Sequence, residues 1–195
     1  MKSSTPKKYS IKVVLVGSSG VGKTSLVNAF FDNPFESQAL PTVAPASCSY
    51  TVILPDEVHV ELQIWDTAGQ ERFQSISHMF YRESHVAFIC YDVPNASSVE
   101  SWIHRVRQEV PECLIFLVIT KTDLLNDEQI QNVEREAEEN LTKFNAKSIF
   151  LTSASSGTGI KDLFNAAAAC YNQVYISNQP TLEINVRTGK SNKCC

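Results

Sequence analysis

The stretch Gly17-Ser18-Ser19-Gly20-Val21-Gly22-Lys23-Thr24 decides the fold of this chain. A glycine, four residues and then Gly-Lys-Thr is the P-loop pattern, whose backbone wraps the phosphates of a nucleotide. The apolar run 13–16 before it suits a buried parallel strand, and Leu26, Val27 and Phe30 after it recur at helical spacing. A strand, the loop and a helix in this order are the context that the motif requires. Without that context the same residues would form an ordinary Gly/Ser turn.

The chemistry of this loop follows from its residue types. Glycines let successive backbone N–H groups turn inward on an anion, and the helix N-terminus adds the positive end of its dipole. Lys23 brings a full charge to the outer phosphates, which gives it a catalytic as well as a binding role, and the Thr24 hydroxyl is expected to hold Mg²⁺. The residues expected to bind phosphate here are Ser19, Gly20, Val21, Gly22, Lys23, Thr24 and Ser25.

The composition fits one ordinary globular domain of 195 residues, 43% of them hydrophobic and 19% charged. The formal net charge of -4 argues against a broad basic surface for nucleic acid. The six cysteines show neither metal-ligand spacing nor a disulfide framework, and Cys194 and Cys195 are adjacent. Because the sequence shows no apolar segment of the secretory or transmembrane kind, we expect a protein of the reducing cytosol.

Apolar runs separated by turn residues give the order of the expected elements. The expected strands are 13–16, 48–54, 58–65, 86–91, 114–119 and 148–152. Helices are expected after the P-loop, around 72–81 and 99–106, and at 127–144 and 160–175. The second and third strands flank Pro55-Asp56-Glu57 and predict an antiparallel hairpin. The sequence therefore predicts an α/β fold of the P-loop NTPase class: a doubly wound, mostly parallel six-stranded sheet with one antiparallel strand and helices on both faces.

Sheets of this kind bind ligands outside the carboxyl ends of their strands. The P-loop and the loops that begin at Asp66, Thr120 and Ser153 all lie at that edge. We expect a nucleotide-binding domain over residues 9–176, preceded by a flexible segment 1–8 and followed by a flexible polar tail 177–195.

The later loops narrow the class. The stretch Trp65-Asp66-Thr67-Ala68-Gly69-Gln70-Glu71-Arg72-Phe73, with Tyr81-Arg82 and Tyr91-Asp92-Val93 after it, resembles a Rab-family small GTPase of the Ras superfamily. The likeness covers about residues 9–175, and the cysteine pair at the terminus is also found in many Rab proteins. The resemblance implies that GTP, GDP and Mg²⁺ are the ligands.

The resemblance assigns roles around the outer phosphate. Asp66 is placed to orient Mg²⁺ across from Thr24, and Thr42 corresponds to the first-switch threonine that joins the Mg²⁺ shell when GTP is bound. Gly69 can bring its backbone N–H to the γ-phosphate, and Gln70 resembles the glutamine that orients the attacking water. Hydrolysis would release both loops, and that change is the switch.

Base choice depends on Thr120-Lys121-Thr122-Asp123. A carboxylate at Asp123 can accept hydrogen bonds from N1–H and the exocyclic amine of guanine, whereas adenine offers no such donor pair. The stem of Lys121 would cover the base plane. In the segment Ser153-Ala154-Ser155, the resemblance gives the backbone N–H of Ala154 a contact to the guanine O6.

The chain departs from the family pattern at three positions: Thr120 replaces an asparagine, Ala44 a glycine, and Ser47 a phenylalanine that often completes an aromatic triad. Trp65 and Phe80 would supply the other two members of that triad. Threonine cannot make all the hydrogen bonds of asparagine, so we expect faster nucleotide release. Effectors cannot be inferred from the relatives.

The terminal Cys194-Cys195 fits double prenylation, because one lipid chain gives only marginal membrane binding. Lys190 and Lys193 would add attraction to anionic lipid. These features predict a protein at the cytoplasmic face of an intracellular membrane that exchanges with the cytosol.

The sequence therefore predicts a Mg²⁺-dependent GTPase switch in vesicle trafficking with a low intrinsic rate, because the first-switch loop supplies no arginine. Its expected partners are an exchange factor, a GTPase-activating protein, effectors on the switch loops, a prenylation escort and a GDP-dissociation inhibitor. Two other hypotheses stay open: a nucleotide-holding scaffold that does not switch, and a metabolic P-loop kinase, for which no lid or acceptor site is evident.

Overall fold

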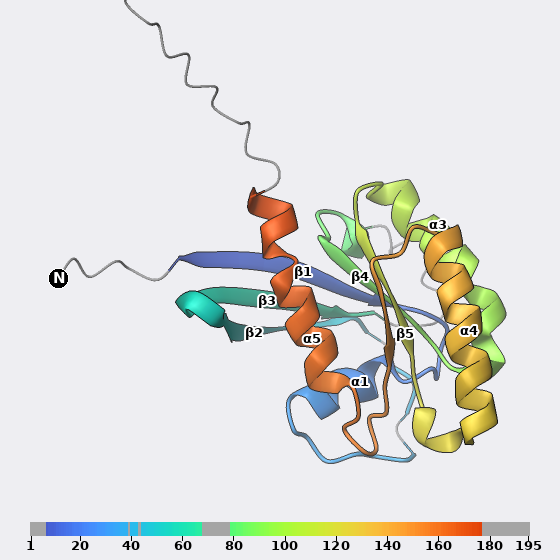
Figure 1. The fold of residues 1–195 in the computed structure, drawn as a ribbon. Coiled ribbons are helices and arrows are strands. Elements are labelled where there is room, and N and C mark those ends of the chain that lie inside the picture. Colours follow the sequence, from blue (N-terminus) through green and yellow to red (C-terminus); the bar gives the residue numbers. More distant parts are fainter. Residues whose placement is uncertain (1–6, 39, 43, 68–78, 177–195) are drawn as a thin grey trace, which may run out of the picture.

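The computed structural model describes residues 7–38, 40–42, 44–67 and 79–176 (Figure 1). The strands are β1 (Lys8–Val16), β2 (Ala46–Leu54), β3 (Val58–Asp66), β4 (Val86–Tyr91), β5 (Leu114–Ile119) and β6 (Ser148–Leu151). The α-helices are α1 (Lys23–Phe30), α3 (Val99–Glu109), α4 (Asp127–Lys143) and α5 (Ile160–Ala169). Shorter helical turns are η1 (Pro55–Glu57), η3 (Val93–Ser98), η4 (Thr122–Leu124) and the π-helical η5 (Asn172–Ile176).

The six strands form one sheet in the order β2-β3-β1-β4-β5-β6. Among the strands of the described residues, β2 and β3 alone pair antiparallel, as a hairpin, and every other neighbouring pair is parallel. The predicted mostly parallel α/β sheet with one antiparallel strand is therefore confirmed. The parallel strands end at one edge of the sheet, where the loops after β1, β4, β5 and β6 meet.

Strands β4 and β5 have the bounds that the sequence predicts, whereas β1 begins at Lys8, five residues before the expected start, because its first residues are polar and only partly buried. All residues of Val86–Tyr91 are buried, as is nearly all of Leu114–Ile119, because helices cover both faces. The edge strand differs, since pairing begins at Ala46, two residues before the expected start. Most of β2 is exposed, so its first residues show no apolar pattern. Most of the helix expected over 72–81 lies outside the described residues.

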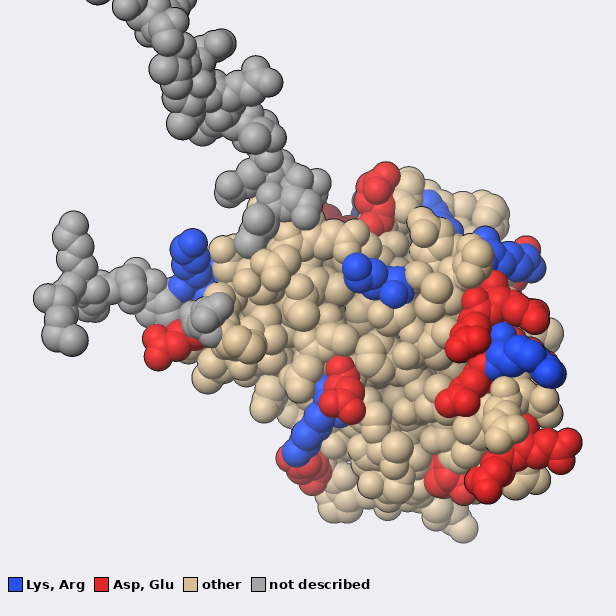
Figure 2. All heavy atoms as spheres, in the orientation of Figure 1, with Lys and Arg blue, Asp and Glu red and all other residues tan. Residues whose placement is uncertain are grey.

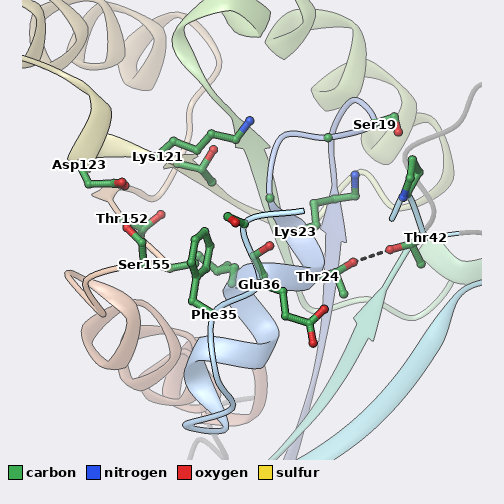
Figure 3. Close-up of a pocket in the computed structure, with 18 of the residues that line it drawn as sticks. Ser19, Lys23, Thr24, Phe35, Glu36, Thr42, Lys121, Asp123, Thr152 and Ser155 are labelled. Atoms are coloured by element: carbon green, nitrogen blue, oxygen red, sulfur yellow. Dashed lines mark hydrogen bonds between the residues drawn. The ribbon is translucent and has the colours of Figure 1, made fainter. Parts of the chain in front are cut away.

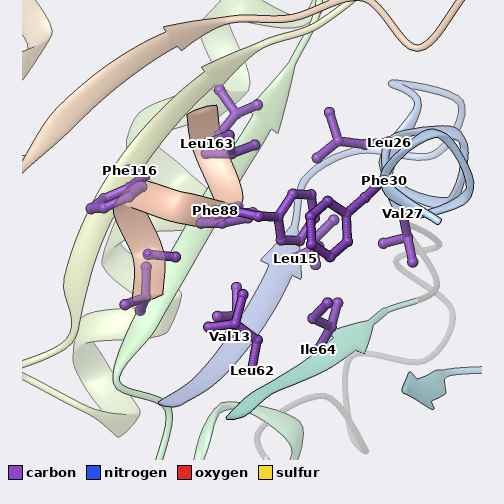
Figure 4. Packing of buried hydrophobic residues seen from close by; sticks show 14 of the residues in the cluster. Val13, Leu15, Leu26, Val27, Phe30, Leu62, Ile64, Phe88, Phe116 and Leu163 are labelled. Carbon is purple, nitrogen blue, oxygen red and sulfur yellow. The ribbon is translucent and has the colours of Figure 1, made fainter. Parts of the chain in front are cut away.

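Two apolar clusters fill the two sides of the sheet. On one side, α1 and α5 pack on β1, β3 and β4, and Figure 4 shows Phe30 of α1 and Leu163 of α5 in this layer with Phe88 of β4. Phe164 stacks on Phe30 with ring centroids 3.9 Å apart. On the other side, Ile103 and Val106 of α3 and Ala137 of α4 pack against the opposite faces of β4 and β5. Full burial of an aromatic or aliphatic side chain contributes about 1.5–3 kcal/mol, so these layers hold the strand ends in place.

Helix α4 carries the charged surface that its sequence predicts. It begins with a reciprocal capping box in which Asn126 accepts from the Gln129 backbone N–H and the Gln129 side chain accepts from the Asn126 N–H. Only Val133 and Ala137 are buried on this helix. Acidic groups gather on the side of the molecule where α4 lies (Figure 2). No helix in the described part of the chain combines the length and apolarity needed to cross a bilayer.

The last helix differs from the expected continuous run over 160–175. Helix α5 ends at Ala169, and the chain continues into the π-helical turn η5. There the Tyr175 hydroxyl donates to the Ser10 carbonyl at 2.6 Å, and the Tyr9 ring lies 4.7 Å from the Tyr171 ring. Tyr171 lies between α5 and η5 and Tyr175 lies within η5, and both contact the start of β1.

Two glycines before α5 allow a matched test of the fold. Gly157 and Gly159 have φ of 77° and 68°, so alanine is strained at either position. A Cβ at Gly159 would lie 2.2 Å from the Leu151 carbonyl oxygen, whereas one at Gly157 meets nothing within 4 Å. We expect Gly157→Ala to cost about 1 kcal/mol of unfolding free energy, and Gly159→Ala to cost a further ~1–3 kcal/mol from the clash. Urea unfolding measures both, and equal losses would contradict the close approach to β6.

Candidate nucleotide-binding site

The P-loop joins the end of β1 to the start of α1 through glycine backbone geometry. Gly22 precedes Lys23, the first residue of α1, with φ of 100°. At Gly17, a Cβ would lie 2.1 Å from the Cys90 carbonyl oxygen of β4, so only glycine fits there. The first turn of α1 holds no acidic residue, and its N-terminal N–H groups therefore face a site suited to an anion.

Lys23 is the buried cation of this loop. Lys23 is 5% exposed, and its ammonium donates to the carbonyl oxygens of Gly17 at 2.8 Å and Ser18 at 2.9 Å. Burial lowers the pKa of this ammonium below its ordinary value. Carbonyl dipoles only partly compensate a buried charge, so an anion in the loop would be strongly attracted.

Three oxygen-bearing side chains meet beside Lys23. The Thr24 hydroxyl donates to Asp66 Oδ2 at 2.6 Å and lies 2.6 Å from the Thr42 hydroxyl. Since Thr24 has one proton, Thr42 is the donor to Thr24. Asp66 Oδ1 is buried and has no hydrogen-bond partner among the described residues. Burial raises the pKa of Asp66, against the lowering effects of Thr24 and Lys23.

These residues fit the Mg²⁺ that the sequence predicts. Hard oxygen donors are the ligands that Mg²⁺ takes in proteins, and Thr24, Thr42 and Asp66 supply them within hydrogen-bond distance of one another. A divalent cation would also satisfy the unpartnered Asp66 Oδ1 and favour the charged carboxylate that burial disfavours.

The loop after β5 lies across the P-loop. The Thr120 hydroxyl donates to the Val21 carbonyl at 2.6 Å, with a longer contact of 3.1 Å to the Tyr91 carbonyl. Threonine thus keeps a tie to the P-loop, although we expect some of the asparagine contacts to be missing. Its single proton is used on backbone oxygens, so none remains to donate to a base.

The predicted guanine-binding carboxylate is held by the loop after β6. Ser153 donates to Asp123 Oδ1 at 2.6 Å, and the Ser155 hydroxyl lies 3.0 Å from that of Ser153. These serine hydroxyls, Ser153 foremost, lower the pKa of Asp123. The backbone N–H and the hydroxyl of Thr122 both donate to the Thr152 carbonyl, which joins the two loops. Asp123 is therefore an oriented, ionised acceptor at neutral pH.

A cavity of about 460 Å³ connects the phosphate and base regions. Figure 3 shows Asp123 and Lys121 at one end, Thr24 and Thr42 at the other, and Phe35 between them. The predicted site residues that line the cavity are Ser19, Gly20, Gly22, Lys23, Thr24, Ser25, Thr42, Thr120, Lys121, Asp123, Ala154 and Ser155. Val21, Asp66 and Ser153 lie behind this lining and support it through the hydrogen bonds above.

Some predicted site residues are not among those that the structure describes, and some lining residues were not predicted. Gly69, Gln70, Cys194 and Cys195 lie outside the described residues. The lining residues not assigned from the sequence are Leu26, Phe35, Glu36, Ser37, Leu40, Pro41, Leu124 and Thr152. The signal available for Phe35 is an aromatic residue in a polar loop, and its ring stays half-exposed at the cavity.

The predicted triad surface combines Ser47 of β2 and Trp65 of β3 with Phe80, which lies in the segment before β4. Ser47 pairs directly with Trp65 across the two strands, and the Trp65 and Phe80 rings are 5.9 Å apart. The Lys12 ammonium lies 4.9 Å from the centre of the Trp65 ring. The two expected aromatic members are thus neighbours, with a serine beside them.

The fold and the site define a P-loop nucleotide-binding protein. Comparison with known proteins narrows this class, because a sequence model of the Ras family matches residues 12–173. Ras-related protein Rab-26 from Bos taurus is 32% identical, over 94% of this chain and 74% of its own length. GTP-binding protein ypt5 from Schizosaccharomyces pombe is 36% identical, over 80% and 75% respectively. Ras-related protein Rab-24 from Dictyostelium discoideum is 33% identical, over 98% and 100%.

The chain therefore belongs to the Ras family of small GTPases, with Rab proteins as its relatives, which confirms the resemblance seen in the sequence. Guanine-nucleotide binding is the common property of this family.

Thr120 generates a kinetic prediction. Asparagine has a donor and an acceptor, so Thr120→Asn should gain a contact, and the natural chain should release GDP several-fold to about tenfold faster than this variant. Thr120→Val removes the bond to the Val21 carbonyl and should release GDP faster still. Release of a fluorescent GDP analogue, chased with excess GDP, gives the three rates. Equal rates for the natural chain and Thr120→Asn would contradict a kinetic role for this position.

Proposed function

We propose that this chain binds GTP and GDP with Mg²⁺, hydrolyses GTP slowly, and acts as a membrane-associated switch in vesicle trafficking. The observation that carries the proposal is the meeting, in one cavity, of a buried ammonium, an oxygen cluster with an unpartnered Asp66 Oδ1, and an oriented Asp123 carboxylate. Phosphates, a divalent cation and a guanine base have complementary chemistry to these three groups.

Lys23 binds the outer phosphates. Two of its three ammonium donors reach P-loop carbonyls, which leaves one for a phosphate oxygen. Bound Mg²⁺ supplies neutralisation of the charge that develops on the phosphates. Thr24, Thr42 and Asp66 hold that cation through their oxygens, and the hydroxyl contact between Thr24 and Thr42 links the first-switch loop to the P-loop.

Asp123 selects guanine. Its carboxylate accepts from the base N1–H and the exocyclic amine, while the bond from Ser153 fixes its direction. The stem of Lys121 and the ring of Phe35 cover the base, since both line the cavity. The Ala154 N–H donates to the guanine O6.

Hydrolysis needs a positioned water, a role that we assign to Gln70, with the Gly69 N–H on the γ-phosphate. The rate is low because the loop that carries Thr42 contains no arginine. An activating protein supplies one, and such a residue is worth roughly 10³–10⁵ in rate. Release of the γ-phosphate frees the switch loops and ends effector binding.

Membrane association depends on the tail. Cys194 and Cys195 carry prenyl groups, which an escort protein delivers and a GDP-dissociation inhibitor extracts. An exchange factor reloads GTP, and effectors bind the switch loops together with the surface of Ser47, Trp65 and Phe80. The relatives named Rab and the GTP-binding protein ypt5 support this assignment.

Gln70→Leu tests the switch against a scaffold that does not hydrolyse. The variant removes the amide that positions water, so activator-stimulated phosphate release should fall by about 10²-fold or more, with GDP and GTP binding unchanged. Single-turnover release of γ-phosphate, with and without an activating protein, measures the effect. Undiminished stimulation of the variant would remove Gln70 from the mechanism. If the natural chain binds GTP and never releases phosphate, the scaffold hypothesis replaces the switch.

Replacing Cys194 and Cys195 together by serine tests the membrane role. Because the described fold forms its core without the tail, the double variant should stay folded and bind GTP while losing its membrane-bound fraction. Cell fractionation together with nucleotide binding measures both. Persistence of the double variant on membranes would show that another surface anchors the chain.

A further inference from the structure

Asp92 lies beside the nucleotide site but belongs to none of the groups assigned above. It follows β4, and the adjacent parallel strand β5 is in register with β4 up to the pair Tyr91 and Ile119. The Thr120 N–H donates to the Tyr91 carbonyl at 2.8 Å, which continues the sheet by one more bond. Asp92 and Lys121 therefore leave the sheet next to each other, although 29 residues separate them.

The two side chains form an ion pair. Lys121 Nζ lies 2.8 Å from Asp92 Oδ2, and the side chains are 38% and 11% exposed. For comparison, the pair of Lys143 and Glu100 has a similar distance of 3.0 Å but exposures of 58% and 67%. Water screens the second pair on both sides, whereas Asp92 is largely shielded. The Lys121 pair is therefore the stronger constraint on a side chain.

The Asp92 carboxylate also accepts a hydrogen bond from η3. The Asn95 side-chain amide donates to Asp92 Oδ1, and the Asn95 N–H donates to the Asp92 carbonyl at 2.9 Å. Ser98 then donates to the Asn95 carbonyl at 2.7 Å, at the end of η3. Burial alone would raise the pKa of Asp92, but the hydrogen bonds from Asn95 and Lys121 outweigh it and lower the pKa. The carboxylate is thus fixed and charged at neutral pH.

The methylene groups of Lys121 line the cavity, whereas its ammonium points away from it. The residue lines the cavity, yet its ammonium is bound to Asp92. Figure 3 shows the side chain extended along the cavity, with its nitrogen pointing away from Asp123. The backbone of Lys121 is left-handed, with φ of 58°, which restricts where the side chain can start. Because the backbone of Lys121 is restricted and its ammonium is bound, the side chain stays extended and exposes its methylene groups to the cavity.

We propose that Asp92 is a positioning residue for nucleotide retention: it anchors the Lys121 ammonium and so holds the lysine stem against the plane of the bound base. The inference rests on the proposed guanine-nucleotide binding and adds a residue to it. Without the anchor, the lysine samples many rotamers, and the ordering of its stem has to accompany every binding event.

The primary test is Asp92→Asn, which keeps the shape of the side chain and removes its charge. We expect release of a fluorescent GDP analogue to become about three- to tenfold faster, because a hydrogen bond to a charged group is lost. Removing a negative charge near an anionic ligand would by itself slow release, so net charge cannot produce this result. Glu100→Gln is the matched control: it removes the same charge from the exposed ion pair and should leave the rate unchanged.

A double-mutant cycle separates positioning from a general structural effect. Lys121→Met keeps an apolar stem and removes the ammonium, so it breaks the same ion pair from the other side. If Asp92 acts through Lys121, the double variant releases GDP no faster than Lys121→Met alone. Additive effects, or a natural release rate for Asp92→Asn, would overturn the proposal.

The melting temperature of each variant is measured alongside its release rate. If Asp92→Asn does not fold, Asn95→Ala replaces it, because this variant removes the support of Asp92 Oδ1 and leaves the charge. It should speed release by a smaller factor, and an unchanged rate would count against the proposal. Failure of the natural chain to bind the GDP analogue would instead overturn the proposed function. Natural binding with an unaffected Asp92→Asn variant overturns only the role of Asp92.

Discussion

The buried ammonium of Lys23 is the constraint on which the rest of the site depends. A charge that is 5% exposed and surrounded by carbonyl oxygens raises the energy of the ligand-free fold. The fold accepts it because Gly17 lies against the Cys90 carbonyl, so that the loop closes tightly around the ammonium. The β1, β4 and α1 elements are packed to keep that loop in place. A phosphate group bound next to Lys23 would compensate this buried charge, so the unfavourable burial of the ammonium favours phosphate binding.

The same loop connects both ends of the cavity. The Val21 carbonyl in the P-loop accepts a hydrogen bond from Thr120, which belongs to the loop 120–123 after β5, here called the base loop. At the end of the P-loop, the Thr24 hydroxyl contacts Asp66 and Thr42. A ligand that moves the P-loop backbone therefore acts on the base loop and on the first-switch loop together. The contact between the Thr24 and Thr42 hydroxyls is one ordinary hydrogen bond, which suits a contact that is broken in the proposed release of the first-switch loop.

The sequence predicts well where one physical signal dominates. Val86–Tyr91 and Leu114–Ile119 have the predicted bounds, because strands buried on both faces are continuously apolar. The start of β2 at Ala46 was missed, since an exposed edge strand has no such signal. The π-helical end after Ala169 was also missed, because it depends on the fit of Tyr171 and Tyr175 to β1. The residues of the P-loop and of the base loop were found from motifs, whereas Phe35 belongs to no motif and no periodic pattern. Asp92 stands in the stretch Tyr91-Asp92-Val93 that carries the family resemblance, but its role next to Lys121 becomes visible only when the register of β4 and β5 is known.

The base end of the site in this chain is held by several modest contacts from different elements. Thr120 spends its one proton on backbone carbonyls, so the loop also depends on the two bonds from Thr122 to the Thr152 carbonyl. The ion pair of Lys121 with Asp92 connects this loop to η3, and the hydrogen bond from Ser153 to Asp123 connects it to the loop after β6. Each of these hydrogen bonds contributes roughly 0.5–1.5 kcal/mol, and more where a charged group takes part. A nucleotide held by many such contacts is released when a partner displaces a few of them. Exchange can therefore be controlled at η3 or after β6, without a change at the phosphates.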